Sequence, residues 1–334
     1  MKRCVPLLLA VLATLTPLPA GQAPPAARTG PWLGETPPGE TPVLFAPGVV
    51  STGLYERDVA VTPDGREFYF GILGNDFAVI AVCRQVDGRW TGPELAPFSR
   101  DPKCLNLEPC VAPDGKRLLF LSTRARAGQE QKPGWADQDI WAMDRTAGGW
   151  GEPYNLGAPV NSDRPEFFPS LTRDGTLYFT REEADKRSAI YRSRRVNGTY
   201  AEPERLPGAV NGGPNLFNAC IAPDESYLVV CIGDRPDNLG RADYYVCFRT
   251  PDDRWSAPVN LGPAVNGKGD AATSPAVTPD GRFFFFGSSR RVPAPAGEAR
   301  TYRALQEERV RPGNGNCDVY WVSTALIEKL RPKP

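Results

Sequence analysis

One short phrase is written five times along this chain, and its repetition constrains the fold more than any single residue does. The copies read Thr-Pro-Asp-Gly, Ala-Pro-Asp-Gly, Thr-Arg-Asp-Gly, Ala-Pro-Asp-Glu and Thr-Pro-Asp-Gly, with aspartates at Asp64, Asp114, Asp174, Asp224 and Asp280. Successive copies lie about 50–60 residues apart. Self-similarity at this period indicates one supersecondary unit repeated five times.

Each copy of the phrase lies between two short apolar runs, and a third run follows. Asp-Gly between such runs is a strong hairpin signal, because glycine accepts the positive φ that tight turns require. After the third run comes an aromatic residue with a proline three positions later, as in Trp90 and Pro93. Proline is tolerated only in an edge strand, where no ladder hydrogen bond is lost. Each repeat therefore predicts a four-stranded antiparallel blade whose fourth strand lies at the rim.

The number of repeats predicts both the number of blades and the way the ring closes. Five first, second and third strands are expected, but only four copies of the fourth strand follow them. The missing copy occurs at the other end of the chain, where residues 42–47 match residues 93–97. We therefore predict an all-β, five-bladed β-propeller over residues 42–334, closed by the N-terminal strand in the last blade, with a short helix near 324–331. Six blades, one of them degenerate, is the alternative.

The blade pattern resembles a known repeat. The phrase is followed by Ser-x-Arg and then by Asp-Ile-Trp or a close variant, as at 112–120, 122–124 and 139–141. This pattern is similar to the TolB-type, WD-repeat-like β-propeller repeat of exported bacterial proteins, over about residues 42–330. The resemblance implies a propeller. It implies no activity, because such repeats occur in scaffolds, in partner-binding modules and beside enzyme domains.

The N-terminal segment has the pattern of an export signal. Lys2 and Arg3 precede an apolar run from Leu7 to Leu15, which is short for a bilayer span, and small residues follow. We predict a signal peptide over 1–23, with a retained anchor as the alternative, and a Pro/Gly-rich linker over 24–41. The protein is then expected to be periplasmic or secreted, with no membrane span after signal removal.

Charge and residue usage exclude several classes of function. Lys and Arg together number 39, as do Asp and Glu, so the chain has no basic footprint for nucleic acid. His is absent, which removes the commonest general base and the commonest transition-metal ligand. We expect no nucleic-acid partner and no cofactor. Calcium is the alternative, since hard cations prefer oxygen ligands.

Two cysteines lie close together in one connection between repeats. Cys104 and Cys110 are the candidate disulfide pair, because export to an oxidising compartment permits disulfides. Spacing alone leaves the connectivity open.

Polar residues just before each first strand are expected at the mouth of the central channel. This predicted ring contains Glu56, Arg57, Asp58, Asn106, Glu108, Asp163, Arg164, Glu166, Asn215, Asn218 and Asp270. It suits a solvated rim that contacts a partner, a ligand or metal site, or a pair of acids for glycoside cleavage. We assign no catalytic residue.

The long connections suggest which face binds. The loops between second and third strands are long at 124–138 and 290–317, and loops on one face of a rigid scaffold are where binding usually resides. A disordered insertion is the alternative for 290–315. The leading interpretation is a non-catalytic binding or scaffold module for a protein or glycan partner, bound on the long-loop face in the cell envelope. The alternative is a carbohydrate-active hydrolase or lyase that uses the ring's acids, namely Glu56, Asp58, Glu108, Asp163 and Glu166.

Overall fold

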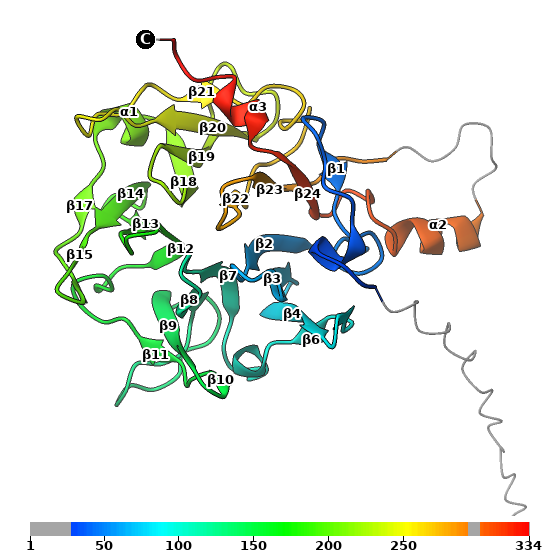
Figure 1. Ribbon diagram of the computed structural model, residues 1–334, viewed down its shortest axis with the longest axis horizontal. Helices are drawn as coiled ribbons and strands as arrows, with labels where there is room; N and C mark the ends of the chain where they lie inside the picture. Colours follow the sequence, from blue (N-terminus) through cyan, green and yellow to red (C-terminus); the bar gives the residue numbers. More distant parts are fainter. Residues whose placement is uncertain (1–27, 293–300, 334) are drawn as a thin grey trace, which may run out of the picture.

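Five antiparallel sheets surround a central axis in the computed structural model, which describes residues 28–292 and 301–333 (Figure 1). Each sheet has four strands that follow one another from the axis outward, and in two of the sheets a fifth, two-residue strand also pairs with the third strand. The expected five-bladed β-propeller is confirmed, and the described residues form no sixth blade. Blades are numbered below in chain order.

The strands occupy equivalent places in the five blades. The innermost strands are β2 (Glu56–Val61), β7 (Asn106–Val111), β12 (Glu166–Leu171), β18 (Asn215–Ile221) and β22 (Ala276–Val277). The second strands are β3 (Glu67–Leu73), β8 (Arg117–Ser122), β13 (Leu177–Glu182), β19 (Tyr227–Gly233) and β23 (Phe283–Ser288). The third strands are β4 (Ala78–Val86), β9 (Asp139–Thr146), β14 (Ser188–Ser193), β20 (Ala242–Phe248) and β24 (Asp318–Ser323). The outer strands are β6 (Glu94–Leu95), β11 (Tyr154–Asn155), β17 (Glu204–Arg205), β21 (Val259–Asn260) and β1 (Val43–Leu44).

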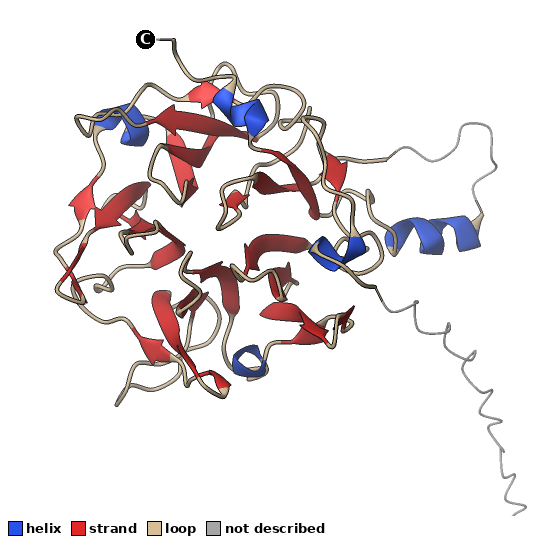
Figure 2. Ribbon diagram, in the orientation of Figure 1, coloured by secondary structure: helices blue, strands red, loops and turns tan. Residues whose placement is uncertain are grey.

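Short helices lie at the periphery of the ring (Figure 2). They are η1 (Trp32–Gly34), η2 (Pro97–Ser99), α1 (Gly208–Asn211), α2 (Tyr302–Arg309) and α3 (Ala325–Glu328). The remaining short strands are β5 (Arg89–Trp90), β10 (Gly149–Trp150), β15 (Arg195–Val196) and β16 (Thr199–Tyr200). Helix α3 lies inside the segment where the sequence predicts a short helix.

The repeated Asp-Gly phrase forms the turn between the first and second strands. In blade 1 the Asp64 carboxylate accepts hydrogen bonds from the Thr62 hydroxyl at 2.6 Å and from the Arg66 amide at 3.1 Å. Gly65 then adopts a φ of 67°, which a side chain disfavours. Blade 4 carries Glu225 at the place of the glycine, and its φ of 63° gives the same turn with some backbone strain.

The N-terminal strand closes the ring, as the sequence predicts. Strand β1 pairs with β24 so that Val43 lies opposite Trp321, and the Phe45 amide donates to the Val319 carbonyl at 2.8 Å. The Phe45 ring is fully buried and stacks on Phe68 of blade 1. The leading segment therefore bonds to the last blade and packs against the first, which removes an open sheet edge.

The described part of the expected linker packs against the ring. Leu33 is fully buried, and Trp32 contacts Phe283 at a ring-centroid distance of 5.3 Å. Residues 28–41 thus contribute to the folded body. The signal peptide expected at 1–23 lies outside the described residues.

Candidate functional site

A β-bulge interrupts the innermost strand of blades 1 to 4 at the same place. The pairing register shifts there in β2, β7, β12 and β18. The bulged residues have positive φ, at 55° for Asp58, 60° for Glu108, 53° for Phe168 and 49° for Asn218. Bulges re-aim side chains, and a non-glycine residue in this conformation costs about 1–3 kcal/mol. Two of the predicted site residues, Asp58 and Glu108, converge at these bulges.

Arg57 joins the two carboxyl groups into one buried cluster. Its Nε donates to Asp58 Oδ2 at 2.6 Å, and one terminal nitrogen lies 3.6 Å from Glu108 Oε1. Glu108 Oε2 also accepts a hydrogen bond from the Phe168 amide at 2.7 Å. The remaining oxygen of Asp58, Oδ1, is buried and has no hydrogen-bond partner among the described residues.

Burial governs the protonation of this cluster. It raises the pKa of Glu108 to about 8; the negative charge of Asp58 adds to the rise, and Arg57 opposes it. Burial alone would lower the pKa of Arg57, but the charges of Asp58 and Glu108 outweigh it and raise that pKa above its usual value. At neutral pH the cluster therefore holds an Arg57–Asp58 ion pair beside a protonated Glu108.

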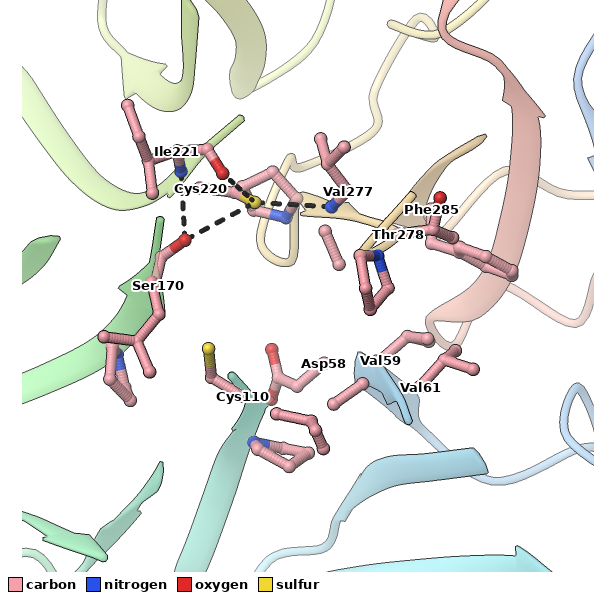
Figure 3. A pocket seen from close by; sticks show the side chains of 18 of the residues that line it. Asp58, Val59, Val61, Cys110, Ser170, Cys220, Ile221, Val277, Thr278 and Phe285 are labelled. Carbon is pink, nitrogen blue, oxygen red and sulfur yellow. Dashed lines mark hydrogen bonds between the residues drawn. The ribbon is translucent and has the colours of Figure 1, made fainter. Parts of the chain in front are cut away.

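A channel leads along the axis from the turn face to this cluster (Figure 3). Turn prolines border one end, among them Pro113, Pro223 and Pro279, and Asp58 and Glu108 lie at the other end. The space within the channel is about 670 Å³ when the gaps between atoms and the open solvent at its mouth are included. The lining between the two ends is mainly apolar, so the carboxyl groups form a polar floor.

One small residue from each blade lines the middle of the channel. We call this set the small-residue ring: Ala60, Cys110, Ser170, Cys220 and Ala276. The Val277 amide donates to Cys220 Sγ at 3.3 Å and the Ile221 amide to Ser170 Oγ at 3.0 Å, so these polar atoms already have partners. The ring was not predicted, although each member lies four residues before the turn aspartate of its blade.

Most of the other predicted site residues do not lie at a solvated channel mouth. Five of them are buried, namely Glu56, Asn106, Glu166, Asn218 and Asp270. Asp163 and Arg164 are exposed on the link that precedes β12, and Asn215 is exposed at the start of β18. The buried ones hold the chain around them: Arg181 donates to Glu166 at 2.8 Å, and the Ser289 amide donates to Asp270 at 2.6 Å. Neighbouring loops and strands use these five as hydrogen-bonding partners, so the interpretation as a solvated rim does not describe them. Their part in binding a ligand or partner stays a prediction.

Glu56 faces a second carboxyl group, that of Asp318 in β24. Burial raises the pKa of Glu56 to about 7; the Thr52 hydroxyl, which donates to Glu56, opposes the rise, and Asp318 adds to it. Burial also raises the pKa of Asp318 to about 6. Neither residue lines the central channel.

The expected disulfide between Cys104 and Cys110 is not formed, and both residues are free thiols. Cys104 lies in the loop before β7, with its Sγ 3.6 Å from Gln131 Oε1. Cys110 lies within β7 and lines the channel. The two thiols therefore occupy different environments despite their closeness in sequence, and burial raises the pKa of Cys110 to about 12.

The two long loops differ in how they are held. Loop 124–138 folds on itself, with the Gln131 side chain donating to the Thr123 carbonyl at 2.9 Å. Loop 290–317 contains α2, which projects beyond the outer edge of the ring (Figure 2). The Thr301 hydroxyl caps this helix by accepting from the Ala304 amide at 3.1 Å, and no residue of the helix is buried.

The chain after α2 is anchored to the link before β2. The Asn314 and Asn316 side chains donate to the Gly53 carbonyl at 3.0 and 2.9 Å. A Cβ at Gly53 would lie 2.5 Å from the Val310 Cα, so the two backbones are in close contact. These segments carry four exposed apolar side chains, and we call this set the α2 surface: Leu54, Tyr302, Leu305 and Val310.

The described residues contain no group of three or more His, Cys, Asp or Glu side chains that could hold a metal ion. The channel floor offers two carboxyl groups beside an arginine, whereas calcium takes about six to eight oxygen ligands. None of the helices within 28–292 and 301–333 is long and apolar enough to span a bilayer.

Comparisons with known proteins give structural likenesses at low sequence identity. No family model and no curated protein matches the chain. TolB from Acinetobacter baumannii is 15% identical with a TM-score of 0.43, and the likeness covers 81% of this chain but only 57% of that one. A putative TolB from Agrobacterium tumefaciens is 15% identical with a TM-score of 0.46, covering 81% and 90%. An arabinanase from Bacillus subtilis is 11% identical with a TM-score of 0.46, covering 81% and 94%. Likenesses at this level do not decide between a binding protein and an enzyme.

Proposed function

We propose that this chain is an exported, non-catalytic β-propeller that binds a protein partner through the α2 surface in the cell envelope. The observation that carries the proposal is the exposure of α2. Tyr302 is 77% exposed, Leu305 is 46% exposed and Val310 is 73% exposed. A helix of this length is marginal in water by itself, and exposed apolar groups gathered on one feature are typical of interaction sites.

The chemistry of the α2 surface favours a protein over a glycan. Aliphatic side chains such as Leu305 and Val310 gain from burial against an apolar groove, as an amphipathic helix does in a partner protein. Four arginines accompany them, namely Arg291, Arg303, Arg309 and Arg311, against Glu307 and Glu308. The partner is therefore expected to offer an apolar groove with an acidic rim.

Site-specific photo-crosslinking in cells of the source organism tests this proposal. A photoreactive amino acid at position 305 is expected to give one protein adduct of fixed mass. The same group at Arg282, exposed in the turn between β22 and β23, is the matched control and is expected to give none. With the probe at Tyr302, the double variant Leu305→Asp and Val310→Asp is expected to lose about tenfold or more of the adduct.

Three outcomes would contradict the proposal. They are equal adducts from both probe positions, an adduct that survives the double variant, and binding of the chain to a glycan array with no protein adduct from position 305.

One observation favours the alternative of a carbohydrate-active hydrolase. Asp58 and Glu108 share the channel floor, and the raised pKa of Glu108 is typical of a general acid. Arg57 pairs with both carboxyl groups, however, and the walls around them are apolar. We expect no cleavage when the chain is incubated with a panel of neutral and acidic oligosaccharides. Cleavage that falls about 100-fold or more in both Asp58→Asn and Glu108→Gln would instead establish the enzyme.

A further inference from the structure

Asp58 lines the central channel and carries a buried hydrogen-bond acceptor without a partner among the described residues. The residue is 4% exposed, its Oδ2 accepts from Arg57, and its Oδ1 has no hydrogen-bond partner within the described part of the chain. Figure 3 shows the Asp58 carboxyl group among the side chains that line the channel, directed toward its interior. A buried carboxylate oxygen without a donor is costly, so a donor that reaches it from the channel binds favourably.

The charges around this oxygen favour a cation over an anion. The Arg57 guanidinium is already engaged, since its nitrogens lie 2.6 Å from Asp58 and 3.6 Å from Glu108. Three other titratable groups near Arg57 and Asp58 are uncharged at neutral pH, and burial raises their pKa values further, namely Tyr55, Cys231 and Cys317. With Glu108 protonated, the charges of Arg57 and Asp58 balance each other. When Glu108 ionises, two carboxylates face one arginine, and one added positive charge then restores the balance. Such attraction is strengthened between walls of low polarity.

The walls of the channel select a slender ligand. The small-residue ring leaves space on the axis, and the larger side chains on both sides of it are apolar, such as Val59, Val61 and Val277. From the turn prolines to the floor, each innermost strand advances by about five residues, or roughly 16 Å. An unbranched aliphatic chain fits such a passage, and a hydrated metal ion gains nothing from its apolar walls.

We propose that the central channel binds a slender aliphatic primary amine, which enters from the turn face and donates through its ammonium group to Asp58 Oδ1. The added positive charge favours the ionised form of Glu108, so binding near neutral pH releases a proton from that residue. The site lies away from the α2 surface and is independent of the function proposed above.

Calorimetry on the full chain with n-hexylamine and 1-hexanol at pH 7 tests the proposal. The amine is expected to bind about tenfold or more tightly than the alcohol, which has the same tail without the charge. Comparison of the heats in phosphate and Tris buffers is expected to show release of up to about one proton per amine. Equal binding of the two compounds, or no binding of the amine at millimolar concentration, would overturn the proposal.

Matched variants locate the binding. Asp58→Asn is expected to weaken n-hexylamine binding about tenfold or more, and Glu152→Gln, at an exposed position outside the channel, is expected to leave it unchanged. Cys110→Leu fills the channel and is expected to abolish binding, while Cys110→Ala is expected to retain it. If Asp58→Asn does not fold, the two Cys110 variants decide the question. If either Asp58→Asn or Cys110→Leu left the affinity for n-hexylamine unchanged, the amine would bind outside the channel and the proposal would be wrong.

Discussion

Replacing Phe45 with alanine is expected to lower the free energy of unfolding by about 3–5 kcal/mol. The Phe45 ring stacks on Phe68 at a centroid distance of 4.7 Å and meets Phe285 and Trp321 nearly edge-on at 5.0 and 5.1 Å. Phe68 belongs to blade 1, whereas Phe285 and Trp321 belong to blade 5. One fully buried side chain therefore ties the two ends of the ring together, and its removal leaves a cavity at the closure. Urea unfolding followed by circular dichroism measures the loss.

Val43→Ala is the matched control for this measurement. Val43 lies in β1, two residues before Phe45, and is 42% exposed. Its truncation removes little buried surface and is expected to cost less than about 1 kcal/mol. Equal losses from both variants would mean that strand pairing alone, without the aromatic contacts of Phe45, stabilises the closure. No loss from Phe45→Ala would contradict the closure as a source of stability.

The fold could be predicted from sequence because its signals are local and repeated. Each Asp-Gly turn needs only an aspartate that accepts nearby amides and a residue that accepts positive φ, and both features are visible in the sequence. The proline of the outer run also marks an edge strand by its own chemistry, because proline has no amide hydrogen to donate to a neighbouring strand. Even ring closure was visible, since residues 42–47 repeat the pattern of 93–97. Five copies of each weak signal make a strong one.

The site was harder to predict because side-chain direction depends on contacts between blades. The sequence placed Asp58 and Glu108 in a group of eleven candidates without showing that bulges would bring these two together. Cys104 and Cys110 illustrate the same limit, since their spacing suggested a disulfide, yet one thiol lies in a loop and the other lines the channel. Helix α2 lies in a segment for which a disordered insertion was the alternative, and its short amphipathic pattern gave no separate signal.

The free energy of unfolding is expected to fall as the pH rises from 5 to 8, by on the order of 3–4 kcal/mol from Glu108 alone. Burial raises the pKa of Glu108 from 4.5 to about 8, with Asp58 adding to the rise and Arg57 opposing it. Between these values the folded protein holds a proton that the unfolded chain has lost. The stabilisation is therefore complete below the unfolded pKa and is lost as the pH passes through the folded one.

Three other buried carboxyl groups act in the same direction, namely Glu56, Asp318 and Glu166, because burial raises the pKa of each. Glu56 and Asp318 have pKa values raised to about 7 and about 6, so each adds to the loss of stability over the same range. Carboxyl groups with lowered pKa values, such as Asp253 beside Arg192, stabilise the fold until the pH falls below about 4. They therefore do not mask the fall in the free energy of unfolding between pH 5 and 8.

Glu108→Gln isolates the contribution of the channel floor. Glutamine resembles the protonated acid in shape and cannot ionise, so the variant is expected to match the parent protein at pH 5 to within about 1 kcal/mol and to exceed its stability at pH 8 by about 2–3 kcal/mol. Glu152→Gln, at an exposed position, is the control and is expected to leave the slope unchanged. Urea unfolding at a series of pH values gives the free energy of unfolding as a function of pH for the parent protein and for each variant. A stability that is flat or rising between pH 5 and 8 in the parent protein would show that Glu108 is ionised in the fold. The channel would then already hold both negative charges, and amine binding would release no proton.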